Sequence, residues 1–319
     1  MSAPWLSIVM PTYNGAAYLR QALESIAVQQ MDDVEIIAID DGSTDDTFAI
    51  LTEFETPLNL QILTRRVGNW AANSNHGLTL ARGAFVCFLH QDDFWYPQRL
   101  QLVRQQLHAT PEVKLLLHAC EFVDPRGHPL GPWRCPYPRA KPMTPAFVVE
   151  RLLVQNFVGM PGATFHRETA LKVGGLDESL WYTADWDLWL TLALVGPTVY
   201  LPQRLGAFRL HPQSQTADRS RSGEDFRQQM HLMTQRHAAA WPVTDAQLRR
   251  DVLATAQASV EINVALAAAY HQQSVSWWRL ATALMELGFT NWPRLLRDSR
   301  LMERVTARLR AGFAKSSTR

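Results

Sequence analysis

Residues 6–40, LSIVMPTYNGAAYLRQALESIAVQQMDDVEIIAID, decide the fold of this chain. The apolar runs at 6–10 and 34–40 are short and rich in β-branched residues, as buried strands are. Asn14 is placed to cap a helix between them. Along that helix, apolar side chains recur at the spacing of one face: Leu19, Ala22, Leu23 and Ile26. The stretch therefore predicts a strand, a helix and a second strand.

The same alternation continues to about residue 120. Three more short apolar runs lie at 60–64, 84–90 and 113–118, and a helical pattern capped by Ser43 or Thr44 precedes the first of them. Strands that alternate with helices imply right-handed crossovers and a mostly parallel sheet with helices on both faces. We therefore expect an α/β fold.

Composition limits the class of protein. The 319 residues are 47% hydrophobic and 19% charged, with a formal net charge of +1. This suits one large domain, or one domain and an appendage, and gives no reason to expect nucleic acid as a partner. Cys87, Cys120 and Cys135 form no close pair, and a buried free thiol is expected for Cys87, so a reducing cytoplasm fits best. Neither a signal peptide nor a membrane span is expected.

Polar clusters follow three of the expected strands. They are PTYN (11–14), DDGSTD (40–45) and HQDD (90–93). In a parallel sheet the ligand site lies beyond the carboxyl ends of the strands, so the three clusters should converge. Asp92 and Asp93 repel each other, which favours a bound cation, a basic partner or exposure to water.

Four segments, in this order, resemble the inverting family 2 glycosyltransferases, which transfer sugars from nucleoside diphosphates and have the GT-A fold. They are SIVMPTYNGAAYLRQALESI (7–26), EIIAIDDGSTDDT (35–47), FLHQDDFWYP (88–97) and GGLDES with ADWDLWLTLALVG (174–179 and 184–196). The resemblance covers roughly residues 5–212. It implies a Rossmann-like central sheet flanked by helices and a hexosyltransferase type of activity, in which a divalent cation, Mn²⁺ or Mg²⁺, neutralises the leaving diphosphate.

The resemblance also assigns the nucleotide-sugar site. Asp41 matches the carboxylate that accepts from the imide N–H of uracil or thymine, with Asp40 as its alternative, so a UDP- or dTDP-sugar is weakly preferred. Asp92 is expected to contact the ribose or to assist the metal. The remaining nucleotide-sugar residues are Pro11, Thr12, Tyr13, Asn14, Arg65, Gly68 and Asn73. For Arg65 and its neighbour Arg66, a solvated loop is the alternative.

Asp93 is the expected metal ligand, and His211 is a further candidate ligand by resemblance. Family members often have an aspartate where this chain has His90, which bears on metal preference. If His211 is not a ligand, it is a strand-end histidine bound to a loop.

The expected general base is Asp185, at the start of a helix that faces the cleft. The family's usual Glu-Asp pair is replaced here by Ala184 and Asp185, and Asp187 is the alternative base. A helix cap is the structural alternative for Asp185. Residues 119–160, rich in proline, are expected to form an irregular loop on the acceptor side.

We therefore divide the chain into a catalytic domain, 1–223, and a helical C-terminal extension, 224–319. The catalytic domain has a nucleotide-sugar-binding half (1–118) and an acceptor half (119–223). Residues 277–319 carry nine basic and three acidic side chains together with tryptophans. They suggest either an interfacial helix on an anionic inner membrane surface, or a helical cap or dimer surface with solvated arginines.

The expected function is transfer of a sugar to a glycan or lipid-linked acceptor in cell-envelope glycan or polysaccharide synthesis, in the cytoplasm or peripherally on the inner face of the membrane. The alternative is a catalytically impaired relative that binds nucleotide-sugar or carbohydrate. A dinucleotide enzyme is disfavoured because PTYNGA (11–16) is no G-x-G-x-x-G loop.

Overall fold

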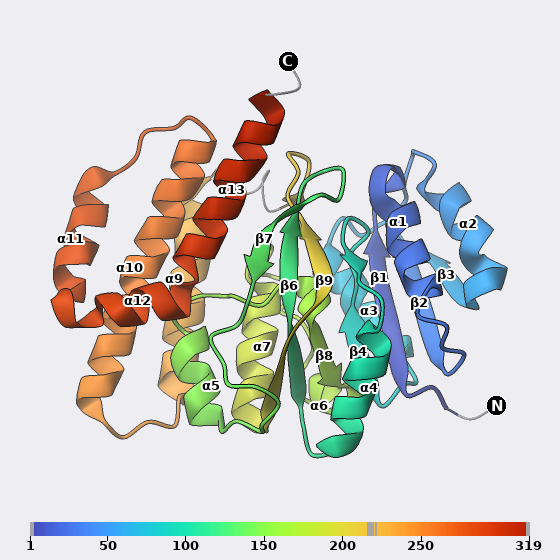
Figure 1. Ribbon diagram of the computed structural model, residues 1–319, viewed down its shortest axis with the longest axis horizontal. Coiled ribbons are helices and arrows are strands. Elements are labelled where there is room, and N and C mark those ends of the chain that lie inside the picture. The colour runs from blue at the N-terminus through green and yellow to red at the C-terminus, as the bar shows by residue number, and fades with distance from the viewer. Residues whose placement is uncertain (1–2, 216–219, 221, 317–319) are drawn as a thin grey trace.

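The computed structural model describes residues 3–215, 220 and 222–316. Its centre is a mixed sheet in the order β3-β2-β1-β4-β8-β6-β9-β5, with β7 paired to β6 (Figure 1). The strands are β1 (Leu6–Thr12), β2 (Val34–Asp40), β3 (Leu60–Thr64), β4 (Phe85–Phe88), β5 (Phe94–Trp95), β6 (Leu115–Val123), β7 (Pro129–Trp133), β8 (Ala163–His166) and β9 (Thr198–Arg209). β1 to β4 pair in parallel, and β8 runs antiparallel between β4 and β6. The five apolar runs all form strands, which confirms the α/β prediction.

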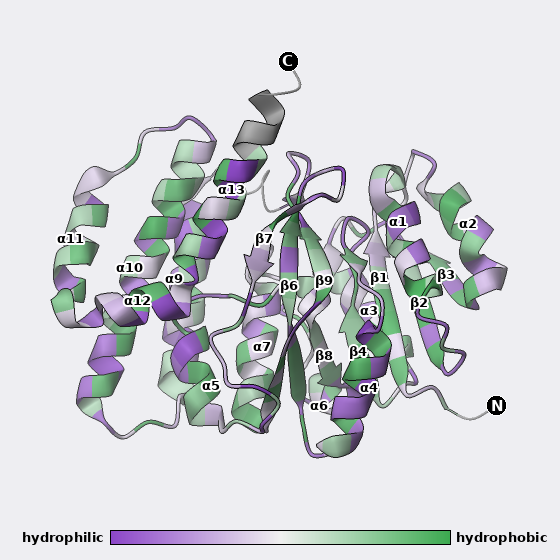
Figure 2. Cartoon of the chain, in the orientation of Figure 1, coloured by the Kyte–Doolittle hydropathy of each residue, from purple (hydrophilic) through white to green (hydrophobic). Residues whose placement is uncertain are grey.

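Helices cover both faces of the sheet. They are α1 (Ala16–Ala27), α2 (Thr47–Leu58), α3 (Trp70–Leu80), α4 (Arg99–Ala109), α5 (Pro145–Leu152), α6 (Arg167–Lys172) and α7 (Ala184–Val195), with a short 3-10 turn, η1 (Met160–Gly162). Successive strand residues point to opposite faces. In β1, Ile8 packs in the core beneath α1 whereas Val9 joins the larger core that includes residues of α3 and α7. Because both faces are covered, the strands are hydrophobic along most of their length (Figure 2).

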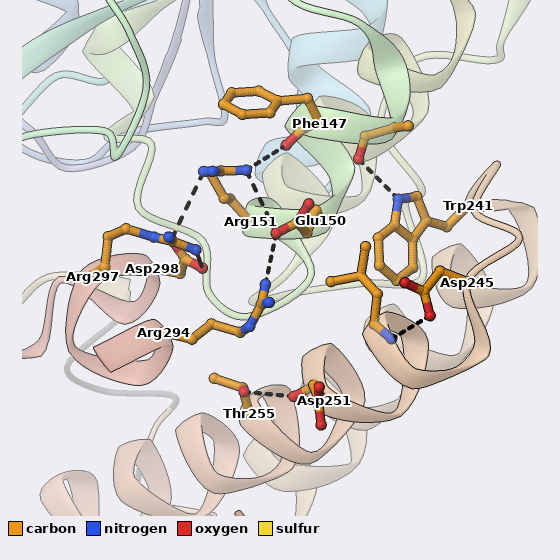
Figure 3. Close-up of polar contacts among 12 residues, drawn as sticks. Phe147, Glu150, Arg151, Trp241, Asp245, Asp251, Thr255, Arg294, Arg297 and Asp298 are labelled. Carbon is orange, nitrogen blue, oxygen red and sulfur yellow. Dashed lines mark hydrogen bonds and ion pairs between the residues drawn. The ribbon is translucent and has the colours of Figure 1, made fainter. Parts of the chain in front are cut away.

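Further helices pack beside this sheet. They are α9 (Gly223–Ala240), α10 (Ala246–Tyr270), α11 (Trp277–Leu287), η2 (Phe289–Asn291), α12 (Trp292–Ser299) and α13 (Leu301–Ser316). Arg294 of α12 donates to Glu150 of α5 at 2.6 Å, and Trp241 donates from Nε1 to the Ala146 carbonyl at 2.9 Å (Figure 3). These contacts join the C-terminal helices to the sheet-bearing part through α5.

The helix α10 meets the length and composition of a membrane span, with a mean hydropathy of 1.4 over an 18-residue window. Half of the window is buried inside the protein. The same helix carries Glu261, which accepts from Nε of Arg227 on α9 at 2.8 Å, and both side chains are buried. Burial and an internal ion pair are features of a helix packed within a protein core.

Two local expectations are wrong. Asn14 does not cap α1, because Gly15 is the N-cap residue and makes no side-chain cap. Asn14 has a left-handed backbone (φ 46°), and its Oδ1 accepts from the Thr44 N–H at 2.8 Å. It therefore holds the loop after β1 against the loop after β2, a contact that sequence spacing does not reveal.

The segment 119–160 is also more regular than expected. It contains the end of β6, the hairpin strand β7 and the helix α5. Phe122 and Trp133 stack across the hairpin with ring centroids 4.6 Å apart. Such a cross-strand aromatic pair stabilises the hairpin, although the proline-rich sequence of this segment does not predict one.

Candidate active site

A cleft of about 1150 Å³ runs along the carboxyl ends of β1, β2 and β4. It collects eleven of the thirteen predicted site residues. They are Pro11, Thr12, Tyr13, Asn14, Asp41, Gly68, Asn73, Asp92, Asp93, Asp185 and His211. Asp40 and Arg65 do not line it, whereas Arg66 does. The three polar clusters therefore meet at one edge, as the parallel topology predicts.

One end of the cleft presents an exposed ring and a carboxylate. Tyr13 is 53% exposed, and its backbone is held on both sides by Gln91, whose Oε1 accepts from the Tyr13 N–H and whose Nε2 donates to the Tyr13 carbonyl, each at 2.8 Å. Asp41 Oδ1 accepts from the N–H groups of Val67 and Gly68 at 2.6 and 3.2 Å. Within the described chain its Oδ2 has no hydrogen bond, so this oxygen is available to a ligand.

Asp40, the alternative to Asp41, has a different role. It is 2% exposed, and its oxygens accept from the backbone of Gly42 and Ser43 and from the Ser43 hydroxyl. All of these contacts lie within its own turn. Asp40 therefore shapes the loop that presents Asp41.

At the centre of the cleft, Asp92 and His211 form a pair, with His211 Nε2 and Asp92 Oδ2 2.9 Å apart. Asp93 is 3% exposed, and its Oδ1 accepts from the Arg209 N–H at 3.0 Å. Burial and the neighbouring Asp92 charge raise the pKa of Asp93. Burial, the largest single effect, would raise the pKa of Asp92, but the His211 hydrogen bond, the neighbouring imidazoles of His90 and His211 and the Asp92 backbone N–H together outweigh it, and the pKa is lowered. Asp92 is thus the better anion of the two.

The donor set suits a divalent cation that completes its coordination from a ligand. No cluster of three or more histidine, cysteine, aspartate or glutamate side chains is found in the described residues. Asp92 and His211 converge, however, and His211 Nδ1 is buried without a hydrogen-bond partner among those residues. Mg²⁺ and Mn²⁺ commonly take one or two protein carboxylates together with phosphate oxygens. Asp92 and the remaining oxygen of Asp93 therefore fit such a cation, with a diphosphate as its further ligand, and His211 would join them only by releasing the hydrogen bond between its Nε2 and Asp92.

His90 is neutral in this setting. Its Nε2 is buried and has no partner in residues 3–215, 220 and 222–316, its ring meets Trp70 edge-on at 5.2 Å, and burial lowers its pKa. It occupies the position where the family often has an aspartate, so the cleft lacks one negative charge there.

Asp185 lies in the first turn of α7 and lines the same cleft. Its Oδ2 accepts from Asn156 Nδ2 at 3.0 Å, and its Oδ1 accepts from the Trp186 N–H at 2.7 Å. Burial raises the pKa of Asp185 to about 6. Such a carboxylate is ionised at neutral pH and basic enough to accept a proton from a hydroxyl.

The neighbours of Asp185 do not share this role. Asp187 is buried, and its Oδ1 accepts from His237 Nε2 at 2.7 Å and from Arg236 Nη1 at 3.0 Å, away from the cleft. Ala184 is fully buried in the hydrophobic core. Position 184, where the family usually has a glutamate, therefore lies on the core-facing side of α7 and not in the cleft.

Several residues that line or support the site are not predicted from the sequence. Gln91 clamps Tyr13, and Arg209 donates to the Asp92 carbonyl from Nε at 2.8 Å. Asn156 contacts Asp185, and Arg304 and Arg308 of α13 line the same cleft. Only the proximity of Gln91 to Asp92 gives a signal in the sequence, because the other contacts join segments that are far apart in the chain.

Comparison with known proteins gives a consistent result. Residues 7–140 match the family Glycosyl transferase family 2. An uncharacterized glycosyltransferase of Rickettsia prowazekii is 28% identical over 217 residues, 66% of this chain and 65% of that protein, so the match spans less than two thirds of this relative.

Solved structures show the same fold. The crystal structure of S. aureus TarS 1-349 in complex with UDP-GlcNAc is similar, with a TM-score of 0.67 and 18% identity over 98% of this chain and 92% of that one. The solved structure of mannosyltransferase PcManGT from Pyrobaculum calidifontis in complex with GDP-Man and Mn²⁺ is also similar, with a TM-score of 0.56 and 19% identity over 99% of this chain and 89% of that one. These similarities show that the fold is that of the GT-A transferases.

Proposed function

From the premise that the chain carries a family 2 glycosyltransferase domain, we propose that it transfers a sugar from a nucleoside diphosphate-sugar to an acceptor hydroxyl with inversion. One observation carries the proposal. A single cleft holds a pyrimidine-compatible carboxylate (Asp41), a metal-compatible pair (Asp92 and His211) and a carboxylate of raised pKa (Asp185).

The donor end suits a pyrimidine nucleotide. The exposed ring of Tyr13 offers a stacking surface for a base, and Asp41 Oδ2, unpaired in the described chain, can accept an N–H such as that of uracil or thymine. UDP- or dTDP-sugar is therefore the proposed donor. The bound UDP-GlcNAc of TarS gives this preference support from a protein of the same fold.

Asp92 and His211, with Asp93, would hold Mn²⁺ or Mg²⁺ against the diphosphate. Such a cation supplies charge that stabilises the leaving diphosphate. The PcManGT structure, which contains Mn²⁺ with GDP-Man, supports a metal for this fold. The chain's own contribution is to keep Asp92 ionised through His211 and to fix Asp93 through the Arg209 N–H.

Asp185 is the proposed general base. The acceptor hydroxyl donates its proton to the carboxylate as the oxygen attacks the anomeric carbon on the side opposite the diphosphate. Asn156 orients the carboxylate by donating to Oδ2. The pKa of about 6 leaves Asp185 mostly ionised at pH 7 while preserving its basicity.

The test combines binding and turnover. Isothermal titration of UDP, dTDP, GDP and CMP into the full chain, with and without Mn²⁺, should show metal-dependent binding of one pyrimidine diphosphate. Release of UDP from a UDP-sugar panel in the presence of glycan acceptors should then be lost in Asp185→Asn, while nucleotide binding persists. Failure of every diphosphate to bind would refute the proposal.

The same experiment addresses the alternative of a binding-only relative. That alternative predicts nucleotide binding with no turnover in either the native chain or Asp185→Asn. The replacement at position 184 does not favour it, because Ala184 is buried in the core and does not line the cleft.

We also propose a cytoplasmic location with peripheral contact to a membrane that carries a lipid-linked acceptor, for synthesis of an envelope glycan. Trp277, Trp278 and Phe289 support it, since they are 71, 75 and 93% exposed on α11 and η2. The charge contribution is smaller than the sequence suggests, because Arg294 and Arg297 are paired with Glu150 and Asp298.

Sedimentation with vesicles tests this contact. We expect binding to vesicles that contain anionic phosphatidylglycerol, and loss of binding in a Trp277→Ala, Trp278→Ala double variant. A chain that stays in solution would refute the membrane contact. If light scattering then detects a dimer that the double variant abolishes, these side chains belong to a subunit interface instead. The basic residues Lys315 and Arg319 lie outside the described side chains.

A further inference from the structure

The helix α13 contributes two arginines to the acceptor end of the cleft. Arg304 and Arg308 lie one helical turn apart and both line it. Arg304 is 5% exposed; its Nε donates to the Ser299 carbonyl at 3.1 Å and its Nη1 to Asn263 Oδ1 at 2.5 Å. Its Nη2 is buried and has no hydrogen-bond partner among the described residues. A buried guanidinium with an unsatisfied donor is costly unless a ligand satisfies it.

These arginines are connected to the proposed base. Asn263, which accepts from Arg304, donates from Nδ2 to Gln155 Oε1 at 2.6 Å, and Gln155 Nε2 donates to the Asn156 carbonyl at 3.1 Å. Asn156 in turn donates to Asp185. A continuous hydrogen-bonded path therefore joins α13 to Asp185. Both arginines, Gln155, Asn156 and Asp185 line the same cleft, so an acceptor whose hydroxyl lies at Asp185 can extend to the arginines.

No protein carboxylate neutralises this pair in the part of the chain that the structure describes. Other arginines of the C-terminal helices have such partners: Arg294 with Glu150, Arg297 with Asp298 and Arg300 with Glu303. Within the described ranges Arg304 and Arg308 form no ion pair, and Arg308 donates to the Arg304 carbonyl at 3.2 Å. Burial and the neighbouring Arg308 charge lower the pKa of Arg304 to about 9. Two adjacent cations without a counter-ion favour an anionic ligand.

Aromatic side chains line the cleft with the arginines. Trp181, Tyr182, Trp133 and Phe208 are all among its lining residues. Ala307 of α13 packs against Phe122 and Leu130, which fixes the helix beside β7 (Figure 1). Aromatic surface next to guanidinium groups suits a sugar ring that carries an acidic substituent.

We propose that the acceptor is anionic, a glycan bearing a phosphate or carboxylate group, and that Arg304 and Arg308 bind that group. The inference rests on the proposed function and specifies its acceptor. The donor diphosphate is assigned to Asp92 and His211, which make no hydrogen bond or ion pair with either arginine within the described residues. The arginines therefore set acceptor choice and leave donor affinity unchanged.

The test is binding of simple probes to the full chain saturated with UDP and Mn²⁺. Isothermal titration compares glucose 6-phosphate, glucuronate and glucose. At least one anionic probe should bind about ten-fold or more tightly than glucose, because a charge-assisted hydrogen bond typically contributes this much. Arg308→Gln and Arg304→Gln should each reduce that affinity about ten-fold, and Arg304→Lys should lose less than Arg304→Gln.

Arg310→Gln is the matched control, since Arg310 is on the same helix but donates to the Leu130 carbonyl and does not line the cleft. It should bind the probes as the native chain does. Arg308 is exposed, so Arg308→Gln reports on the site even if Arg304→Gln fails to fold.

Two results would overturn the inference. One is glucose binding as tightly as both anionic probes. The other is a parallel loss of UDP affinity in the arginine variants, which would assign the arginines to the donor diphosphate. Titration of UDP into the native chain distinguishes failure of this inference from failure of the proposed function. If UDP does not bind, the donor site is wrong, while the probes still test the arginines in the nucleotide-free chain.

Discussion

Replacing Asp185 by asparagine isolates the proposed base with little change of shape. The asparagine side chain keeps an oxygen that can accept from Asn156 Nδ2, but its amide cannot take up a proton. Removal of a general base typically lowers turnover by about 10²–10⁴-fold. Since Asp185 shares no hydrogen-bond partner with Asp92 or His211 within the described residues, UDP affinity should stay within about two-fold of the native value, because sites without shared partners act nearly independently.

The same substitution should also change how the free energy of unfolding depends on pH, in a direction that follows from the raised pKa of Asp185. The folded pKa of about 6 lies above the ordinary value for aspartate. The ionised carboxylate therefore destabilises the folded state fully above about pH 6, and this cost disappears as pH falls toward about 4. Asp185→Asn removes this cost but loses the acceptor for one of the two N–H donors, Asn156 Nδ2 or the Trp186 N–H, so its melting temperature relative to the native chain should rise as pH increases from about 4 to about 7.5.

Turnover of the native enzyme should fall with decreasing pH through about 6, since the base must be ionised. The assay measures UDP release from about pH 5 to 8, together with UDP titration and thermal melting of both proteins. Asp185→Asn retaining more than about a tenth of native turnover would refute the assignment.

Asp187→Asn is the matched control on the same helix. It removes buried contacts to His237 and Arg236, so we expect a loss of about 1–3 kcal/mol in the free energy of unfolding. Turnover per folded molecule should be unchanged. Lower turnover in Asp187→Asn with native activity in Asp185→Asn would show that the two roles are reversed.

Three further changes follow from the site. Gly15→Ala would place a Cβ 2.3 Å from the Gln91 carboxamide, so Gln91 should lose its hydrogen bonds to the Tyr13 backbone. UDP titration should then show weaker binding. The melting temperature should change little, because the φ of Gly15 is −102°, which alanine also adopts. His211→Ala should weaken metal-dependent UDP binding about 10–100-fold, and unchanged Mn²⁺ dependence in titration would exclude its role beside Asp92. Arg294→Gln should loosen α12 from Glu150, lowering the free energy of unfolding by about 1–3 kcal/mol in urea; no change would mean that the ion pair is too solvated to contribute.

The parts of the fold that sequence predicts are those that depend on local pattern. The strands β1, β2 and β4 are recognisable because burial on both faces requires continuous apolar runs. The convergence of residues 11–14, 40–45 and 90–93 follows from parallel pairing alone. Asp185 could be placed at the start of its helix because its neighbours repeat at helical spacing.

The residues that sequence misses depend on contacts between distant segments. The role of Asn14 is set by the loop around Thr44, and that of Arg209 by the loop around Asp93. Whether Arg65 or Arg66 faces the cleft depends on the exact path of one loop after β3. Arg304 could not be distinguished from the other basic side chains of its segment, because only packing decides which of them is left without a carboxylate.

The hydrogen-bonded path from Arg304 through Asn263, Gln155 and Asn156 to Asp185 connects the C-terminal helices to the proposed base. Residues on both sides of the boundary near residue 223 line the same cleft. Exchange of the C-terminal helices between relatives would therefore disturb both acceptor preference and the alignment of the base.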